Sequence, residues 1–231
     1  ARIGASIGFA RFPETARTFL PGGAPIRAGD LIAMPEYATT LRLIAAKGPG
    51  ALYGGDLGAT VADYMRRDGG IITLDDLARY ETIERQPIRG RYRGFEITGP
   101  PPPTAGGLHL VEMLNILEGC DPRGLGFGTA DYFHLIAEVL KIGFADRNAC
   151  TGDPAFVDIP MERLLSKEHA AMRRAQIRPD RAGEYGAIAD MAGGVAAGSA
   201  HTTHVTTADA DGNVVAMTQT INNLFGSKAT V

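Results

Sequence analysis

The feature that most constrains the fold of this chain is a pair of β-prone segments near its C-terminal end. The segments cover 205–208 and 214–218, and Asp211-Gly212-Asn213 stands between them. Such a turn sequence between strand-forming residues is a strong short-range signal for a β-hairpin. A hairpin folds the chain back, so the hydroxyl residues at its two open ends are expected to meet.

Thr202 and Thr220 are these hydroxyl residues, and Thr220 is predicted to fall within a residue or two of the position opposite Thr202. Asn222 projects from the same face as Thr220, with donor and acceptor groups. A threonine becomes a good nucleophile when a base lies beside it, and cutting the chain before it supplies its own α-amine. Threonine is also common in ordinary strands. The residues alone leave both interpretations of Thr202 open.

Two histidines flank this threonine, His201 and His204, and a histidine is a common catalytic base. Neighbouring residues of a strand point to opposite faces, which argues against a pair made by Thr202 and His201.

The composition is that of an ordinary globular protein. The chain has 231 residues, 45% of them hydrophobic and 21% charged, with a net charge of −3. This length allows one large domain or two small ones. The absence of a block of like charges argues against nucleic acid or an anionic membrane as a partner. No apolar run approaches the roughly 18 residues needed to span a bilayer.

The two cysteines, Cys120 and Cys150, form no disulfide framework and are expected to be packed or incidental thiols. No spacing of His, Cys or Asp resembles a zinc or EF-hand site. We therefore expect no metal and no cofactor.

Periodicity and breaker residues predict a mixed α/β chain. The expected elements are helices over about 35–47, 58–67, 108–118, 131–147 and 161–177, a short capped helix after Thr73, and a strand pair over 86–98 broken at Gly94. The glycine-rich segment 178–200 is predicted to be a flexible linker.

Three local features have open or modest interpretations. The run Pro100 to Pro103 before Thr104 is either a stiff connector, a ligand for an SH3-like module, a pocket wall, or the approach to a helix N-terminus that faces an anion. His134 is expected to be a satisfied core or boundary histidine. Asp146 is expected to pair with Arg147.

A further expectation concerns the charged run Arg173-Arg174, which is predicted to be solvated at the end of its helix. The amphipathic segment 1–18 and the abrupt end at Val231 suggest that the chain is a piece of something larger.

The C-terminal motif and several upstream segments resemble the γ-glutamyltransferase family. The matching segments are Thr203-x-x-Thr206 after Thr202, Asp211-Gly212-Asn213-x-Val215-Ala216, Thr218-x-Thr220-Ile221-Asn222, Phe225-Gly226, Gly69-Gly70-Ile71-Ile72-Thr73-x-x-Asp76-Leu77-Ala78-x-Tyr80, Pro101 to Gly107, Ala145-Asp146-Arg147 and Gly152-Asp153-Pro154. They follow the family's order through most of the chain. Thr207 departs from the pattern, since the family usually has an aliphatic residue there.

The resemblance implies a fold and a division of the chain. The fold is the four-layer α/β/β/α sandwich of the N-terminal nucleophile hydrolases, made as a precursor, or zymogen, that cuts itself. Residues 1–201 would be the C-terminal part of a large-subunit-like region, with 178–200 as the linker before the cut. Residues 202–231 would begin the small-subunit-like region, and processing would give a heterodimer.

The resemblance also implies a mechanism. The Thr202 hydroxyl would attack the His201 carbonyl, and hydrolysis of the resulting ester would free the Thr202 amine as the general base. Thr202 would then attack a γ-glutamyl amide such as that of glutathione, and water or an amine would resolve the acyl-enzyme. Thr220 matches the position that supports the nucleophile. Asn222 matches one that binds the glutamyl head group.

Several family residues fall outside the chain. The family's substrate arginine would precede residue 1, and its acidic residue, serines and oxyanion glycines would follow Val231, so the chain alone is expected to be a poor catalyst. Alternatives are a related acylase on another amide, such as a cephalosporin acylase, and a non-catalytic binding or scaffold domain on the same fold. The resemblance also implies a periplasmic or secreted enzyme.

Overall fold

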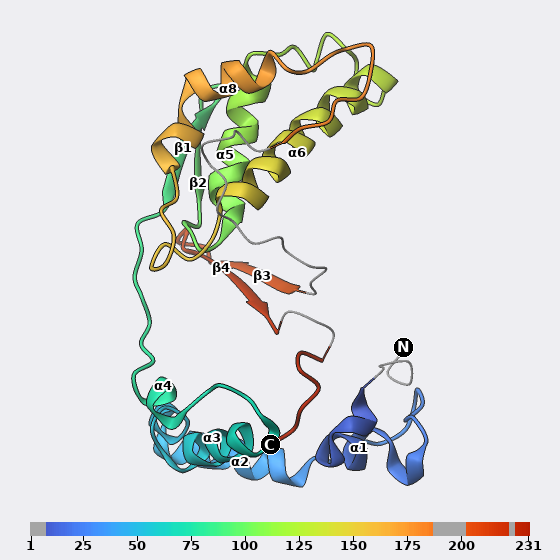
Figure 1. Cartoon of the computed structure of the whole chain (residues 1–231), viewed down its shortest axis with the longest axis vertical. Helices are drawn as coiled ribbons and strands as arrows, with labels where there is room; N and C mark the ends of the chain where they lie inside the picture. The colour runs from blue at the N-terminus through green and yellow to red at the C-terminus, as the bar shows by residue number, and fades with distance from the viewer. Residues whose placement is uncertain (1–7, 187–201, 222–224) are drawn as a thin grey trace. The chain divides into compact units, whose positions relative to one another are not determined.

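The computed structural model describes residues 8–186, 202–221 and 225–231 (Figure 1). Contacts divide the chain into two compact units, one formed by Ala1–Thr82 with Ser199–Val231 and the other by Ile83–Gly198. These two units do not correspond to residues 1–201 and 202–231. The division at the 201–202 bond describes the expected processing and stays a prediction.

The first unit combines short helices with one β-hairpin. Its elements are α1 (Pro13–Phe19), α2 (Pro35–Lys47), α3 (Asp56–Asp68), α4 (Leu74–Ala78), β3 (Thr202–Ala208) and β4 (Val214–Thr220). The predicted helices over 35–47 and 58–67 are confirmed. So is the cap of α4, where the Thr73 hydroxyl accepts the Asp76 N–H at 3.2 Å and the Asp76 carboxylate accepts the Thr73 N–H at 2.8 Å.

Residues 225–231 pack against the start of the same unit. The Phe225 ring lies 5.0 Å from that of Phe9 and 5.9 Å from that of Phe19, measured between centroids. The buried Thr15 hydroxyl donates a 2.7 Å hydrogen bond to the Lys228 carbonyl. These contacts fix the segment that follows the hairpin.

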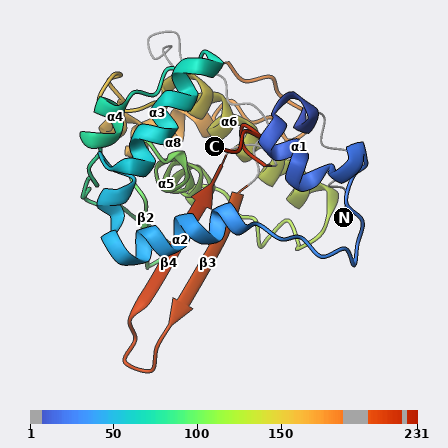
Figure 2. The same ribbon diagram turned by 90° about the horizontal axis from the view of Figure 1, so that it is seen from below.

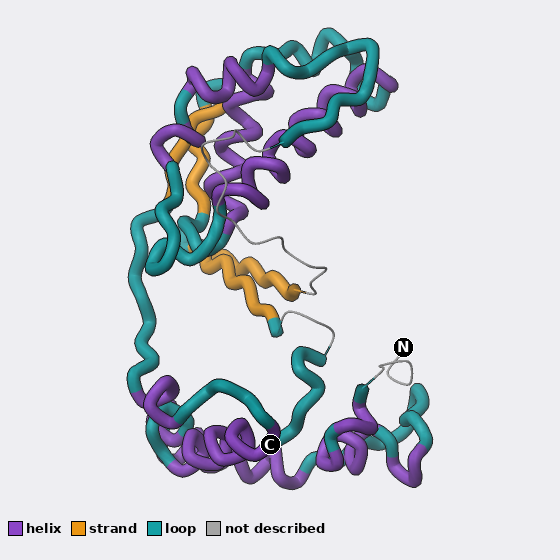
Figure 3. Tube along the Cα trace, viewed as in Figure 1, coloured by secondary structure: helices purple, strands orange, loops and turns teal. Residues whose placement is uncertain are grey.

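The second unit is built around one helix. Its elements are β1 (Ile88–Tyr92), β2 (Phe95–Gly99), α5 (Ala105–Glu118), α6 (Ala130–Cys150), α7 (Met161–Leu165) and α8 (Lys167–Arg174). Helix α5 contacts the antiparallel β1–β2 pair as well as α6, α7 and α8 (Figures 1 and 3). The strand pair approaches α5 closely because Gly90 has no side chain. A Cβ at this position would lie 2.4 Å from Val111 Cγ1.

Buried aliphatic side chains of α5 and α6 form the core of this unit. Ile116, Val139 and Ile142 cluster with Ala170 of α8, while Leu108 clusters with Cys150 and Leu164. Both cysteines are free, as expected. Burial raises the pKa of the Cys150 thiol to about 11.

Two predicted helices have different bounds in the structure. Helix α6 runs past residue 147 to Cys150, and the Thr129 hydroxyl caps its first turn. The prediction of a single helix over 161–177 is wrong, because the chain leaves helical geometry at Ser166. The Ser166 hydroxyl accepts the His169 N–H at 3.1 Å and starts a separate helix, α8. None of the described helices combines the length and hydropathy needed to cross a membrane.

Residues 178–186, called the strap below, lie along α6 and hydrogen-bond to its side chains. The buried Glu138 carboxylate accepts the Gly183 N–H at 2.9 Å and the Tyr185 hydroxyl. Lys141 donates to the Gly183 carbonyl at 2.7 Å, and Arg173 to the Gly186 carbonyl at 3.1 Å. Residues 178–186 thus have specific hydrogen bonds to α6 and α8, while 187–200 lie outside the described residues and the flexible linker stays a prediction.

Candidate functional site

The two predicted catalytic threonines pair directly across the open end of the β3–β4 hairpin. Thr202 lies opposite Thr220 in the antiparallel register, and the Thr202 hydroxyl donates to the Thr220 hydroxyl at 3.3 Å. The strands run side by side over this length (Figure 2). The predicted cross-strand position of Thr220 is confirmed, and the strands extend beyond the β-prone cores at 205–208 and 214–218.

His204 lies on the same face of β3 as Thr202 because it is two residues away. Its Nδ1 is 2.7 Å from the Thr218 hydroxyl, and its Nε2 is 3.0 Å from the Thr206 hydroxyl. Both ring nitrogens therefore have partners other than Thr202. This arrangement favours a structural role for His204 over that of a base.

The turn of the hairpin is held by the Asp209 carboxylate. It accepts the N–H groups of Asp211 at 3.0 Å and Asn213 at 2.9 Å, and the Asn213 side-chain amide at 2.8 Å. These hydrogen bonds lower the pKa of Asp209. Gly212 has φ of +85°, a conformation that suits glycine. The predicted turn is thus present and sets the register of the two threonines.

His201 and Asn222 lie outside the described residues. The roles assigned to Thr202, Thr220, His201 and Asn222 in cleavage and binding remain predictions.

A second polar arrangement, called the buried cluster below, lies in the core between α5, α6 and α8. Its members are His109, Glu112, Asp146, His169 and Arg173, each at most 3% exposed. His169 Nε2 is 3.1 Å from a Glu112 oxygen and 3.2 Å from an Asp146 oxygen, and Arg173 donates to both Asp146 oxygens. His109 Nδ1 is 2.6 Å from the other Glu112 oxygen.

This cluster corrects two predictions. Asp146 pairs with Arg173 and not with Arg147, and Arg173 is buried instead of solvated. The sequence signal was the spacing of charged and polar residues on apolar helix faces, as in His169 and Arg173 four residues apart on α8. His134 behaves as predicted, since its Nε2 donates to the Arg178 carbonyl at 2.7 Å.

The ionisation of the buried cluster follows from its contacts. Burial opposes the charged forms of Asp146 and His169, but hydrogen bonds between them, from Arg173 to Asp146 and from His169 to Glu112, outweigh it. They lower the pKa of Asp146 and raise the pKa of His169 to about 9. Burial raises the pKa of Glu112.

Glu112, Asp146 and His169 each offer an atom suited to a metal ion, and these atoms lie within 4.8 Å of one another. Arg173 already binds both oxygens of Asp146, and its positive charge beside the site would repel a cation. The donor set therefore fits an internal ion-pair network better than a metal site.

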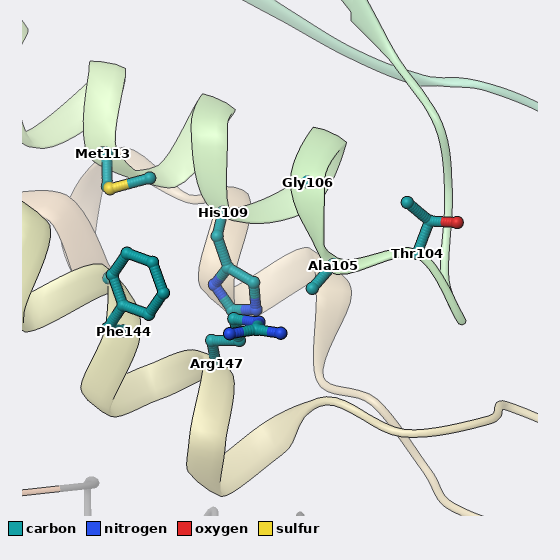
Figure 4. A pocket seen from close by; sticks show the side chains of 8 residues that line it. Thr104, Ala105, Gly106, His109, Met113, Phe144 and Arg147 are labelled. Carbon is teal, nitrogen blue, oxygen red and sulfur yellow. The ribbon is translucent and has the colours of Figure 1, made fainter. Parts of the chain in front are cut away.

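A cavity of about 370 Å³ opens between the start of α5 and the end of α6 (Figure 4). His109 and Met113 line it from α5, and Phe144 and Arg147 from α6. Thr104 is among the residues at its rim. The Arg147 guanidinium lies 5.5 Å from the centre of the Phe144 ring.

The sequence of the whole chain matches a family model. The model described as gamma-glutamyltranspeptidase covers residues 4–231. The chain belongs to the γ-glutamyltranspeptidase family. Its relatives include the acylase ACY 1 proenzyme of Pseudomonas sp. (strain SE83), 54% identical over 218 residues, and the glutathione hydrolase proenzyme of Escherichia coli (strain K12), 40% identical over 220 residues.

These alignments cover 94% and 90% of this chain but only 38% and 36% of the two relatives. The chain thus spans little more than a third of their length. Both relatives are named as proenzymes, which agrees with the family's processed, two-part organisation.

Solved structures of γ-glutamyltranspeptidase-family proteins have the same mixed α/β fold. A Helicobacter pylori gamma-glutamyltranspeptidase matches 76% of this chain and 50% of its own, with a TM-score of 0.71 and 34% identity. A cephalosporin acylase from Bacillus halodurans matches 92% and 37%, with a TM-score of 0.74 and 29% identity. The α/β class is confirmed, while the complete four-layer sandwich remains an expectation for the whole protein.

Two γ-glutamyltranspeptidase-like segments far apart in sequence meet at the cavity. Thr104 and Gly106 come from the segment Pro101 to Gly107, and Arg147 from Ala145-Asp146-Arg147. Of the interpretations of the proline run, a pocket wall at a helix start agrees with this geometry.

Proposed function

We propose that the whole protein is an amide-cleaving acyltransferase or hydrolase whose nucleophile is Thr202, freed by autocleavage of the 201–202 bond. The observation that carries the proposal is the Thr202–Thr220 pair at the open end of the hairpin. A hydroxyl partner at this position fixes the Thr202 rotamer before any substrate arrives. The proenzyme relatives support the same order of events.

Autocleavage begins when Thr202 Oγ attacks the His201 carbonyl carbon, and the Thr202 nitrogen leaves with a proton. Water then hydrolyses the ester, which gives a carboxylate on His201 and a free amine and hydroxyl on Thr202. An α-amine has a pKa of about 7.7–8.0, so part of it is unprotonated at neutral pH and able to accept a proton.

In turnover, the Thr202 amine takes the hydroxyl proton as Oγ attacks the substrate's amide carbon. The same proton passes to the departing amine, and an ester-linked acyl-enzyme remains. Attack by water gives hydrolysis, and attack by an acceptor amine gives transfer. Asn222 is placed by its sequence position to bind the head group of the acyl part.

An acylase substrate is favoured over glutathione. The relative named as an acylase is 54% identical to this chain, against 40% for the glutathione hydrolase. We therefore propose an acyl amide other than the γ-glutamyl amide of glutathione as the preferred substrate. A γ-glutamyl amide is the second candidate, supported by the family itself. Export to the periplasm or the medium stays part of the proposal.

Mass spectrometry of the purified chain tests the nucleophile. The proposal predicts slow formation of fragments 1–201 and 202–231, abolished by Thr202→Ala. Thr203→Ala is the matched control, because it also replaces a threonine by alanine but removes a hydroxyl on the opposite face of β3. Cleavage at another bond, or unchanged cleavage in Thr202→Ala, contradicts the assignment.

Two chromogenic amides separate the substrate classes on the full-length protein. Glutaryl-p-nitroanilide and γ-glutamyl-p-nitroanilide differ only by the α-amino group. Higher kcat/KM for the glutaryl compound supports the acylase, and the reverse order supports the γ-glutamyl enzyme. Turnover of neither, in a protein that has cleaved itself, favours a binding or scaffold role.

A further inference from the structure

The cavity between α5 and α6 contains a cation without an anion. Within the described residues no carboxylate pairs with the Arg147 guanidinium. The guanidinium lies over the face of the Phe144 ring. Asp146, its neighbour in sequence, is turned into the core and bound by Arg173. A half-buried guanidinium beside a cavity and without a counter-ion favours an anionic ligand.

The α5 side of this cavity is held in place before any ligand binds. The His109 ring is held from both sides, by Glu112 at 2.6 Å and by the Thr151 hydroxyl at 2.6 Å. Gly143 allows Met113 to pack against α6, since a Cβ there would lie 2.6 Å from Met113 Cγ. Rigid walls lower the entropy lost on binding.

The chemistry of the lining is uneven. Met113, Gly143 and Phe144 supply an apolar floor, and the guanidinium supplies the one charge. Figure 4 shows the His109 and Arg147 side chains projecting from the two helices toward the same region. At the rim, the Thr104 side chain makes no capping hydrogen bond to the first turn of α5, which adds a weak preference for negative charge.

From the unpaired Arg147, the apolar floor and the preformed walls, we propose that this cavity binds a small monocarboxylate with an apolar tail. The carboxylate pairs with the Arg147 guanidinium, and the tail lies against Phe144 and Met113. The volume of about 370 Å³ falls within the range of small-molecule sites. The inference does not depend on Thr202 or on the proposed reaction.

A ligand-observed NMR titration of the chain with 3-phenylpropionate tests the site, with 3-phenylpropionamide as the uncharged analogue. We expect saturable binding of the acid and binding about tenfold weaker or more for the amide, because a charge-assisted hydrogen bond is lost. Arg147→Gln is expected to weaken acid binding by a similar factor and to leave the weak amide binding unchanged.

Arg123→Gln is the matched control, since Arg123 is an exposed arginine of the same unit that does not line the cavity. It removes the same charge and is expected to preserve binding. Circular dichroism checks that both variants are folded. No saturable binding of the acid overturns the proposal, as does equal binding by Arg147→Gln.

Repeating the titration on the full-length protein separates a free ligand from a carboxylate of the remaining polypeptide. Binding that persists supports the small-molecule site. Binding that is lost there shows that protein fills the cavity and overturns the proposal for a free ligand.

Discussion

The charged residues in the core of the second unit are bound by one another rather than by solvent. His169 is held between two carboxylates, and Arg173 covers one of them. Removing one partner of such a buried pair leaves the other charge uncompensated, which costs more than the pair itself contributes. Single substitutions here are expected to act on stability before they act on chemistry.

The raised pKa of His169 makes stability depend on pH. A folded-state pKa of about 9 against an unfolded value of 6.5 means that the folded chain binds this proton more tightly. The stabilisation is complete below about pH 6.5 and is lost as the pH rises through about 9. It is on the order of 3 kcal/mol.

Urea unfolding at pH 6.5 and at pH 9.5 measures this difference. We expect the free energy of unfolding to fall over this interval in the parent chain and to change much less in His169→Gln. Glu112 and Asp146 contact the His169 ring and Arg173 contacts Asp146, so the comparison between the two slopes is the informative quantity. Equal slopes contradict the assignment of the proton to His169.

At the scale of elements, local signals predicted what is local. The hairpin, its register and the cap of α4 follow from turn and capping residues close in sequence. The break at Ser166 and the buried cluster do not, because they depend on α5, α6 and α8 packing together. The local pattern predicts a solvated Arg173 for this reason, since its partner Asp146 lies on a different helix.

The strap is a second example of contacts that local sequence does not predict. Its glycines suggest flexibility, but Gly183 is required where the chain crosses the Glu138 carboxylate. A Cβ at Gly183 would lie 2.5 Å from the Tyr185 hydroxyl and 3.0 Å from a Glu138 oxygen.

Gly183→Ala is expected to release the strap and speed trypsin cleavage after Arg181 several-fold. Gly186→Ala is the control, since a Cβ there meets nothing within 4 Å. Limited proteolysis read by mass spectrometry compares the two. Equal cleavage in both variants contradicts the fixed strap.

At the scale of the whole molecule, the chain holds the proposed nucleophile, Thr202, and spans little more than a third of its relatives' length. The face of the hairpin opposite Thr202 carries Val205, Val215 and Met217, all of them exposed. An isolated two-stranded hairpin is marginally stable in water. The sequence identified the family, while the placement of the other site residues outside this chain stays an expectation from the family resemblance.

The 231-residue chain is therefore expected to turn over amide substrates far more slowly than a full-length protein. If the oxyanion donors lie outside this chain, as the family resemblance implies, their loss alone accounts for about 10²–10³-fold. A p-nitroanilide assay with equal concentrations of both proteins measures the ratio. Comparable rates contradict the expectation that groups outside this chain complete the site.

Because the Asp209–Asn213 turn sets the strand register, an insertion or deletion in the hairpin would separate Thr202 from Thr220. Thr202 and Thr220 lie at the end of the hairpin farthest from that turn, yet the turn decides that they meet. If the turn keeps its hydrogen bonds, one residue inserted after it passes into β4 and brings Gln219 opposite Thr202. Evolution can therefore exchange many side chains along these strands, but it cannot freely change the number of residues that separates the two threonines.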